Sequence, residues 1–255
     1  MSDKGGNRMS TSTKSDKIWL WAASFYAIVV ILLGAYANYS HPYSPQPVTT
    51  ANFWTLFLWG LLYVPVIVLP LATTANTAKP WRVTDFGFTL NIRMALITLV
   101  CVLVALATVS ITITWTNAIL EAFARTGEEV FFRGFLLALF TQLFAQRRHP
   151  RRWAVLLSAL LFALIHTQTF RPEFGEWYSS AYMPLAYRIF ERLLNLFLSA
   201  LVLALLCAWT RSVLPIAILH SALNSGILTL PFVMLIYGLI TFWAHKRGEQ
   251  VVLQL

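Results

Sequence analysis

Residues 94–115 read MALITLVCVLVALATVSITITW and contain no charged side chain. A helix needs about 20 mainly apolar residues to cross a hydrocarbon core about 30 Å thick, so this run predicts a membrane-spanning helix. The whole chain has the same character, because 58% of its 255 residues are hydrophobic, 11% are charged and its mean hydropathy is +0.67. A soluble domain is about half apolar and about a quarter charged. We therefore expect an all-α, polytopic transmembrane helical bundle.

Six other apolar runs also predict spans, although two of them are short. They cover Ile18–Ala37, Phe53–Ala72, Val130–Ala145, Trp153–Ile165, Phe190–Trp209 and Val213–Ala244. The last run would be about 48 Å long as one helix, which is long for one span and tight for two. Because Ser225-Gly226 and Pro231 favour a turn, we expect two helices that meet near Gly226–Pro231. The predicted total is eight spans, with seven as the alternative.

The Lys and Arg residues predict the orientation of these spans, since basic loops generally stay in the cytoplasm. The basic segments are the N-terminal tail, residues 73–93, residues 146–152, Arg211 and Lys246-Arg247. Loop 38–52 has no Lys or Arg, and residues 116–127, which we read as a loop, carry one Arg against one Glu. Basic and non-basic segments alternate for eight spans with both termini in the cytoplasm. Seven spans would place Lys246 and Arg247 outside.

Two other features of the composition carry no functional weight. The net charge of +9 does not indicate nucleic-acid binding, because the chain has no basic, aromatic-rich soluble segment. The two cysteines, Cys101 and Cys207, lie inside apolar runs, where packing is a more ordinary role than a disulfide or a metal site.

The first cluster of ionisable residues in an apolar region is Glu128-Glu129 with Arg133. A charge at the bilayer centre costs roughly 2.5–3.5 kcal/mol on insertion scales, so such groups generally face a protein interior. Helical spacing places Glu129 and Arg133 on one face, where they can pair. Glu128 is rotated away and is predicted to have no partner on its own helix, which suits a general base. The alternative is two structural glutamates that stabilise a helix N-terminus.

Two histidines form the other clusters. His166 follows the predicted span Trp153–Ile165, where capping is the ordinary alternative, and Phe162 lies one turn earlier and can hold its ring. His220 and Asn224 share a helix face, and interhelical hydrogen bonding is the ordinary alternative for them. In the eight-span topology His166, His220 and Asn224 lie at a depth similar to that of Glu128, in the non-cytoplasmic half of the membrane. This common depth favours one shared site.

The three clusters, in this order and spacing, resemble the signature of the CPBP family of intramembrane proteases, which includes CAAX prenyl endopeptidases and bacterial abortive-infection or bacteriocin-immunity proteins. The matching residues are Glu128-Glu129 with Arg133, Phe162 with His166, and His220 with Asn224. The resemblance covers roughly residues 80–230, including Asp85-Phe86-Gly87-Phe88 and the run from Arg211 to His220. It implies that Glu128 and His166 activate a water molecule for peptide hydrolysis and that His220 and Asn224 stabilise the oxyanion. Glu129 and Arg133 would brace the site.

A catalytic metal is the alternative to this metal-free chemistry. Glu128, His166 and His220 would be its ligands, since two histidines and a glutamate can hold a catalytic zinc. The chain has no H-E-x-x-H sequence, and Asn224 is a poor zinc ligand but a good oxyanion donor. We therefore expect a glutamate mechanism without a cofactor, with zinc as the second possibility.

Together these patterns predict four regions. Residues 1–17 would be a disordered cytoplasmic tail, residues 18–79 two accessory transmembrane helices, residues 80–230 the protease core, and residues 231–255 the last helix and cytoplasmic C-terminus. We expect an intramembrane endopeptidase of a bacterial-type plasma membrane that cleaves a membrane-associated protein or peptide. The prenylated substrate of the eukaryotic relatives is not carried over, because the predicted site faces outward.

Two other functions compete with this expectation. A non-catalytic membrane scaffold or bacteriocin-immunity protein could keep the fold, although it would not need the complete set of polar residues. A proton-coupled transporter would also hold Glu and His residues in the membrane. It would place them along a path across the bilayer rather than at one depth.

Overall fold

The computed structural model describes residues 14–40, 57, 60–61, 63–74, 81–108, 114–170 and 184–248. Within these ranges the chain is almost entirely helical and forms no extended strand, which confirms the all-α prediction. The elements are α1 (Lys14–Ser40), α3 (Val64–Thr73), the 3-10 turn η1 (Val83–Phe86), α4 (Ile92–Thr108), α5 (Trp115–Glu129), the π-helix η2 (Val130–Leu136), α6 (Leu137–Leu143), α7 (Pro150–Ile165), the 3-10 turn η3 (Thr167–Phe170), α9 (Leu185–Thr210), α10 (Leu214–Ser225), the 3-10 turn η4 (Ile227–Thr229) and α11 (Leu230–Lys246).

The distribution of apolar and charged side chains is that of a membrane protein. Three helical stretches are long and apolar enough to cross a bilayer, namely Leu20–Ala37, Leu185–Thr210 and Ile227–Lys246. Large apolar side chains on α1, α4, α9 and α11 are exposed, whereas the charged pair Glu129 and Arg133 is buried. Apolar surface outside and charge inside is the arrangement that lipid favours, because charged groups avoid hydrocarbon.

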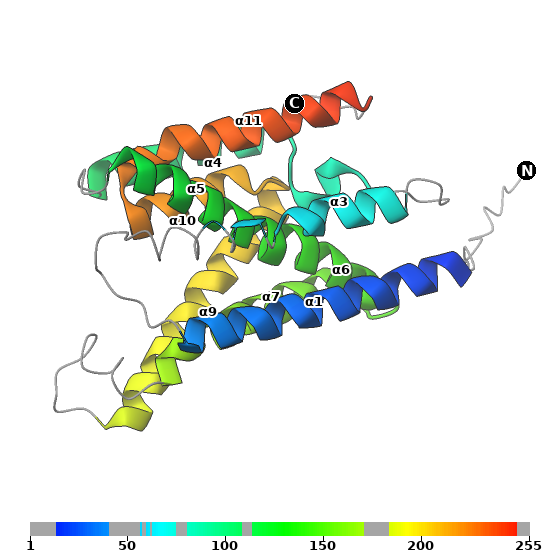
Figure 1. The fold of residues 1–255 in the computed structure, drawn as a ribbon, viewed down its shortest axis with the longest axis horizontal. Helices are drawn as coiled ribbons and strands as arrows, with labels where there is room; N and C mark the ends of the chain where they lie inside the picture. Colours follow the sequence, from blue (N-terminus) through cyan, green and yellow to red (C-terminus); the bar gives the residue numbers. More distant parts are fainter. Residues whose placement is uncertain are drawn as a thin grey trace, which may run out of the picture.

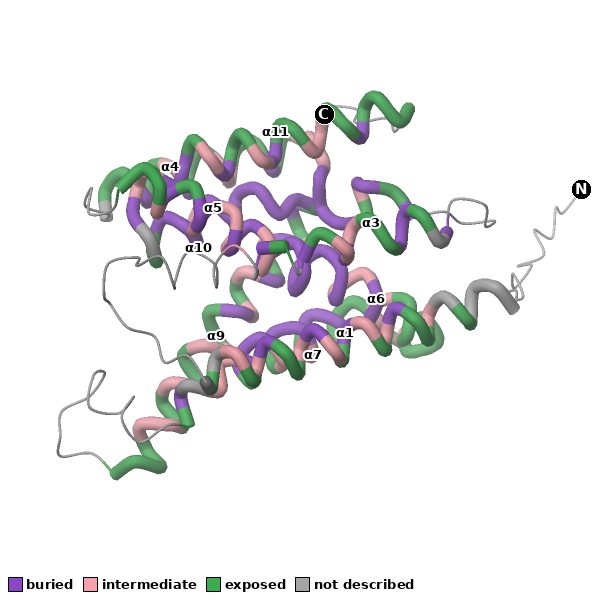
Figure 2. The backbone as a smooth tube through the Cα atoms, in the orientation of Figure 1, coloured by how far each residue is buried: buried purple, intermediate pink, exposed green. Residues whose placement is uncertain are grey.

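One continuous helical segment made of α5, η2 and α6 runs through the middle of the molecule (Figure 1). It lies between α1 and α7 on one side and α4, α10 and α11 on the other, and α9 packs along α7. The π-helix η2 contacts α3, α7, α9 and η1, and all seven of its residues are buried. Figure 2 shows this buried stretch near the centre of the tube, surrounded by helices with exposed outer faces.

The central segment differs from its prediction, because residues 116–127 are helical and do not form a loop. The helix α5 begins after Thr114, whose side chain accepts a hydrogen bond from the backbone amide of Asn117. Small residues such as Ala118 and Ala122 are buried at helical spacing. Mean hydropathy does not detect such an amphipathic helix, because its polar residues lower the average. As a result, Glu128-Glu129 lies inside a long helical segment and not at its N-terminus.

Other helix limits also differ from the predicted ones. The helix α1 begins at Lys14, so residues 14–17 are helical and not disordered; residues 1–13 lie outside the described residues. The helix α9 begins at Leu185, five residues before the predicted span, and ends with Thr210. The predicted span Phe53–Ala72 is described only in part, mainly as α3.

The predicted break in the last apolar stretch is confirmed. The helix α10 ends at Ser225, Gly226 follows with a φ of 91°, and α11 begins at Leu230 with Pro231 in its first turn. A glycine suits this φ because it has no Cβ, and a proline suits the first turn because that turn needs no amide donor. The helix α10 has 12 residues, about 18 Å, which is shorter than a hydrocarbon core.

Side chains from two neighbouring helices hold the π-helix in place. The hydroxyl of Ser158 on α7 donates a hydrogen bond to the Phe132 carbonyl at 2.6 Å. The thiol of Cys207 on α9 donates to the Arg133 carbonyl at 3.6 Å. Both Cys207 and Cys101 are free and buried, in agreement with a packing role. These contacts fix the rotation of the helix that carries the glutamate pair.

The segment between α3 and α4 packs closely against the other side of the π-helix. A Cβ added at Gly134 would lie 2.6 Å from the backbone oxygen of Phe86. The same segment is tied to the end of α9, because the Val213 amide donates to the Gly87 carbonyl at 3.0 Å. Asn91 donates through its side chain to the Thr210 carbonyl at 2.8 Å. The glycine at position 134 thus permits the backbone contact that joins this segment to the centre of the molecule.

Candidate active site

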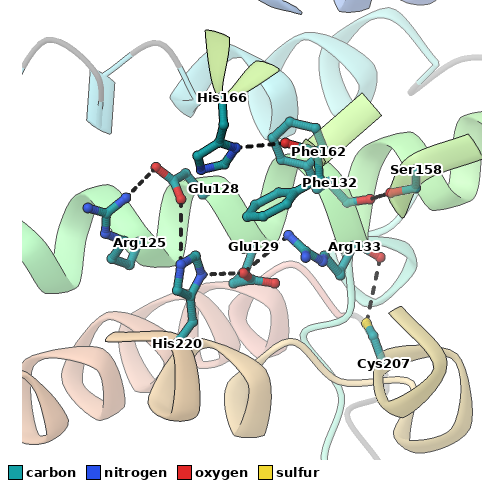
Figure 3. Close-up of polar contacts among 10 residues, drawn as sticks. All are labelled: Arg125, Glu128, Glu129, Phe132, Arg133, Ser158, Phe162, His166, Cys207 and His220. Atoms are coloured by element: carbon teal, nitrogen blue, oxygen red, sulfur yellow. Dashed lines mark hydrogen bonds and ion pairs between the residues drawn. The ribbon is translucent and has the colours of Figure 1, made fainter. Parts of the chain in front are cut away.

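Glu128 forms an ion pair on its own helix, contrary to the prediction that it lacks one. The Arg125 guanidinium donates to Glu128 Oε1 at 2.8 Å, and its Nε lies 3.2 Å from the Glu121 carboxylate (Figure 3 for the Glu128 contact). The pairing depends on the helical spacing of three between Arg125 and Glu128, which exists because residues 116–127 belong to α5 and do not form the predicted loop. The side chain of Glu128 is 19% exposed, but its second oxygen, Oε2, is buried and has no hydrogen-bond partner among the described residues.

Glu129 is fully buried and has two partners. Arg133 donates to Glu129 Oε1 at 3.2 Å, as the helical spacing predicted. His220, on α10, places Nδ1 2.6 Å from the same oxygen. Since a carboxylate oxygen only accepts hydrogen bonds, Nδ1 of His220 is the donor. Glu129 therefore joins α5 to α10 in addition to neutralising Arg133.

The imidazole of His220 lies between the two carboxylates of the doublet. Its Nδ1 faces Glu129, and its Nε2 is 3.9 Å from Glu128 Oε2 (Figure 3). That second distance is longer than a direct hydrogen bond. The side chain of His220 is 10% exposed, so the ring is nearly enclosed.

His166 approaches Glu128 from α7. It caps the C-terminus of that helix, and its Nδ1 lies 2.7 Å from the Phe162 carbonyl. Because a carbonyl oxygen accepts, Nδ1 carries the proton and Nε2 of the neutral ring is left as an acceptor. Figure 3 shows the His166 ring beside the Glu128 carboxylate.

The ring of Phe162 lies at the centre of these groups. Its centroid is 4.7 Å from that of His166 and 6.0 Å from that of His220. The guanidinium carbon of Arg133 is 4.2 Å from the same centroid, a distance at which a cation is attracted to an aromatic face. Phe162 therefore holds both imidazoles and the buried arginine in fixed positions.

Asn224 is the one predicted site residue that lies apart from this group. It is exposed, one turn after His220 on α10. Within the described ranges we find no hydrogen bond from its side chain to the other site residues. The structure therefore brings together Glu128, Glu129, Arg133, Phe162, His166 and His220, and it adds Arg125, which holds Glu128.

The donor set is a poor fit to a catalytic metal. Among the residues described here, no group of three His, Cys, Asp or Glu side chains is arranged to hold a metal ion. Nδ1 of each histidine is engaged, by Glu129 or by the Phe162 carbonyl, so Nε2 is the ring nitrogen left for the site, and these contacts do not decide the question of a metal. Arg125 and Arg133 also place two positive charges beside the carboxylates, and these would repel a divalent cation.

The arrangement supplies the groups that amide hydrolysis needs. It contains a partly exposed carboxylate, a histidine with a free acceptor nitrogen, and a second histidine oriented by a buried carboxylate. A positioned carboxylate or imidazole can take a proton from water. An oriented imidazole can donate to a developing oxyanion. All of these groups project from helices, which hold them at fixed distances.

Residues 107–226 match the family model of type II CAAX prenyl endopeptidase Rce1-like proteins. This range includes all of the site residues described above, from Arg125 to Asn224. No curated protein and no solved structure matches the chain. The match confirms the resemblance that the order of the three motifs indicated.

Proposed function

Residues 107–226 form a domain of the CPBP family of intramembrane proteases, and from that premise we propose that Glu128 and His166 activate a water molecule that hydrolyses a peptide bond. The observation that carries this proposal is the position of Glu128. One of its oxygens is held by Arg125, and the other faces His220 Nε2 at 3.9 Å. Oε2 is buried without a hydrogen-bond partner among the described residues, so it is the oxygen that can take a proton from a water molecule.

In the proposed reaction, the water donates one hydrogen to Glu128 Oε2 and the other to Nε2 of His166. Its oxygen attacks the carbonyl carbon of the peptide, and Glu128 takes the proton. Glu128 then passes this proton to the leaving nitrogen as the C–N bond breaks. Atoms and charge balance without any other reactant, and we propose that no metal or other cofactor takes part.

We assign the oxyanion to His220 and Asn224. In its protonated form, His220 donates Nδ1–H to Glu129 and presents Nε2–H to the carbonyl oxygen. The Glu129 contact at 2.6 Å holds the ring in the orientation that this donation requires. Asn224 lies one turn along the same helix and would supply the second donor. Preorganised donors of this kind lower the barrier by about 3 kcal/mol each.

The substrate of this reaction is a protein or peptide associated with the membrane. The site lies on helices that also carry exposed apolar residues, such as Ile119 on α5 and Leu223 on α10. A substrate therefore reaches it from the bilayer or from its surface. We propose a multi-pass protein of a bacterial-type plasma membrane with this activity.

The decisive experiment compares two glutamates that share one arginine. Glu121 and Glu128 both pair with Arg125, but only Glu128 faces His220. The Glu128→Gln, His220→Ala and Glu121→Gln variants would be purified in detergent and assayed on a quenched fluorogenic peptide library. We expect the first two to lose at least about 100-fold in kcat, whereas Glu121→Gln stays within about threefold of the parent protein.

Cleavage by Glu128→Gln at the parent rate would disprove the role of Glu128 as a base. The same assay with and without a chelator tests the metal-free mechanism. Activity that is lost on chelation and restored by zinc would replace it with metal-assisted hydrolysis. A parent protein that binds the peptides but cleaves none would favour the scaffold or immunity function.

A further inference from the structure

A second polar site lies on the other side of the π-helix from the histidines. It is a pocket with a volume of about 700 Å³, bounded by the segment 81–91, η2, α6, the start of α7 and the end of α9. Its charged lining consists of one carboxylate, Asp85, and four arginines, Arg82, Arg133, Arg151 and Arg211. Arg133 already pairs with Glu129, and the proposed hydrolysis does not use Asp85 or the other three arginines.

Of these three arginines, Arg82 lies close enough to Asp85 to interact with its carboxylate electrostatically. Within the described ranges we find no ion pair from Arg82, Arg151 or Arg211 to a carboxylate. The Asp85 side chain instead accepts a hydrogen bond from the backbone amide of Arg82 at 2.8 Å, which caps the η1 turn. The pocket therefore has an excess of positive charge and offers several guanidinium donors to an anion.

The backbone of Arg211 provides an independent indication that its side chain matters. Arg211 is the only non-glycine residue with a positive φ, 55°, among the described residues. It occupies the position after α9 where glycine is the ordinary residue, because a Cβ strains this conformation. The strained backbone is held by the Thr89 hydroxyl, which donates to the Arg211 carbonyl at 2.6 Å. A guanidinium is thus kept at a position where a glycine would fit better.

The surroundings of the pocket place it at the surface of the membrane. Trp153 and Trp209, two residues away from Arg151 and Arg211, are 55% and 50% exposed. Exposed tryptophans gather at the level of the lipid headgroups. The segments that line the pocket also belong to the basic loops that the charge pattern assigns to the cytoplasmic face. Phospholipid phosphates are found at this depth.

We infer that this pocket binds the phosphate group of an anionic phospholipid, with Arg82, Arg151 and Arg211 as the phosphate ligands. Guanidinium groups pair with phosphate oxygens in bidentate fashion, and basic pockets between membrane helices accept lipid headgroups. The volume is within the range of about 300–1,000 Å³ typical of small-molecule sites. This inference goes beyond the proposed hydrolysis and does not depend on it.

The chain offers well-matched variants for a test. Arg211→Gly removes one guanidinium and relieves the positive φ, so the fold is retained. Arg151→Gln removes a second guanidinium from the surface. Arg152→Gln is the control, because Arg152 is the next residue on α7 and is exposed but does not line the pocket.

Binding would be measured by native mass spectrometry of the delipidated full chain in detergent, titrated with phosphatidylglycerol, phosphatidylcholine or inorganic phosphate. We expect phosphatidylglycerol to bind most tightly, and the Arg151→Gln/Arg211→Gly variant to weaken its binding by about tenfold or more. The Arg152→Gln variant should stay within about twofold of the parent.

Three outcomes would overturn the inference. Equal binding of phosphatidylglycerol and phosphatidylcholine would exclude recognition of an anionic headgroup. An equal loss in Arg152→Gln would show general attraction to a basic surface and not a site. Binding of inorganic phosphate as tightly as phosphatidylglycerol would identify a soluble phosphate compound as the ligand in place of a lipid.

Discussion

His220 Nδ1 lies 2.6 Å from Glu129 Oε1, so the second glutamate of the doublet connects two helices that are far apart in the sequence. The same oxygen accepts a hydrogen bond from Arg133. Glu129 therefore positions the histidine and neutralises the arginine at once. The first glutamate, Glu128, is held separately by Arg125.

Glu129→Gln should lower kcat by at least about 100-fold with little change in KM. The amide is nearly the same size, but it lacks the charge that orients His220 through Nδ1–H, and loss of such an orienting carboxylate is severe in other enzymes. The measurement is steady-state cleavage of a peptide substrate. A rise in KM with unchanged kcat would mean that Glu129 contributes only to substrate binding.

Glu129→Ala should destabilise the fold by about 3–5 kcal/mol, because it leaves Arg133 as an uncompensated buried charge. Arg133→Leu should have a similar effect, because it leaves the buried Glu129 carboxylate without its counter-charge. The double variant should cost less than the sum of the two single changes, as expected for residues in direct contact. The free energies of unfolding would be measured in detergent by circular dichroism. If the effects of the two single changes add up to that of the double variant, the pair does not interact.

Arg125→Gln should reduce kcat by about tenfold or more, because the guanidinium that holds Glu128 Oε1 at 2.8 Å is lost. Arg125→Lys should recover part of the activity, since an ammonium keeps the charge but not the fork geometry. The comparison uses kcat for the two variants with protein stability measured in parallel. If both variants kept the kcat of the parent protein, Arg125 would have no positioning role.

Two glycines give opposite expectations for the same substitution. Gly134→Ala should destabilise the protein by about 1–3 kcal/mol, since its Cβ would lie 2.6 Å from the Phe86 carbonyl oxygen. Gly238→Ala should be neutral or stabilise by up to about 1 kcal/mol, because this residue lies within α11 and no atom lies within 4 Å of an added Cβ. The melting temperatures of the two variants would be measured by thermal unfolding in detergent. Similar melting temperatures would contradict the close contact between Gly134 and Phe86.

The predicted topology can be tested with single cysteines at two exposed positions. We expect Arg148→Cys to react with a membrane-impermeant maleimide only in inverted vesicles, because loop 146–152 carries four arginines. Tyr39→Cys, near the end of α1, should react only in right-side-out cells. The native Cys101 and Cys207 are buried and should not contribute. Reversed labelling would show that the site opens toward the cytoplasm.

Much of the candidate site could be predicted from local spacing. The contact between Glu129 and Arg133 follows from their positions four residues apart on one helix. Phe162 lies one turn before His166 for the same reason. Arg125 was missed because hydropathy did not distinguish the amphipathic helix α5 from a loop, and once that helix is recognised, its spacing of three from Glu128 is sufficient.

The sequence by itself determined that the chain is helical, that it belongs in a membrane and which side chains are chemically unusual there. Hydrocarbon imposes these features, because it requires long apolar helices and penalises every isolated charge. The break at Gly226 was likewise local, since it depends on turn-forming residues.

Only the tertiary structure decided which atoms of the unusual residues meet. The contacts of His220 with Glu129, of Ser158 with Phe132 and of Gly134 with Phe86 all join separate elements. Such contacts depend on how helices are rotated and spaced, which ridge-and-groove packing sets and which no pattern within one helix contains. For this reason Glu128-Glu129 was recognisable as unusual in the sequence, but its division into one partly exposed carboxylate and one fully buried, histidine-positioning carboxylate was visible only in the folded chain.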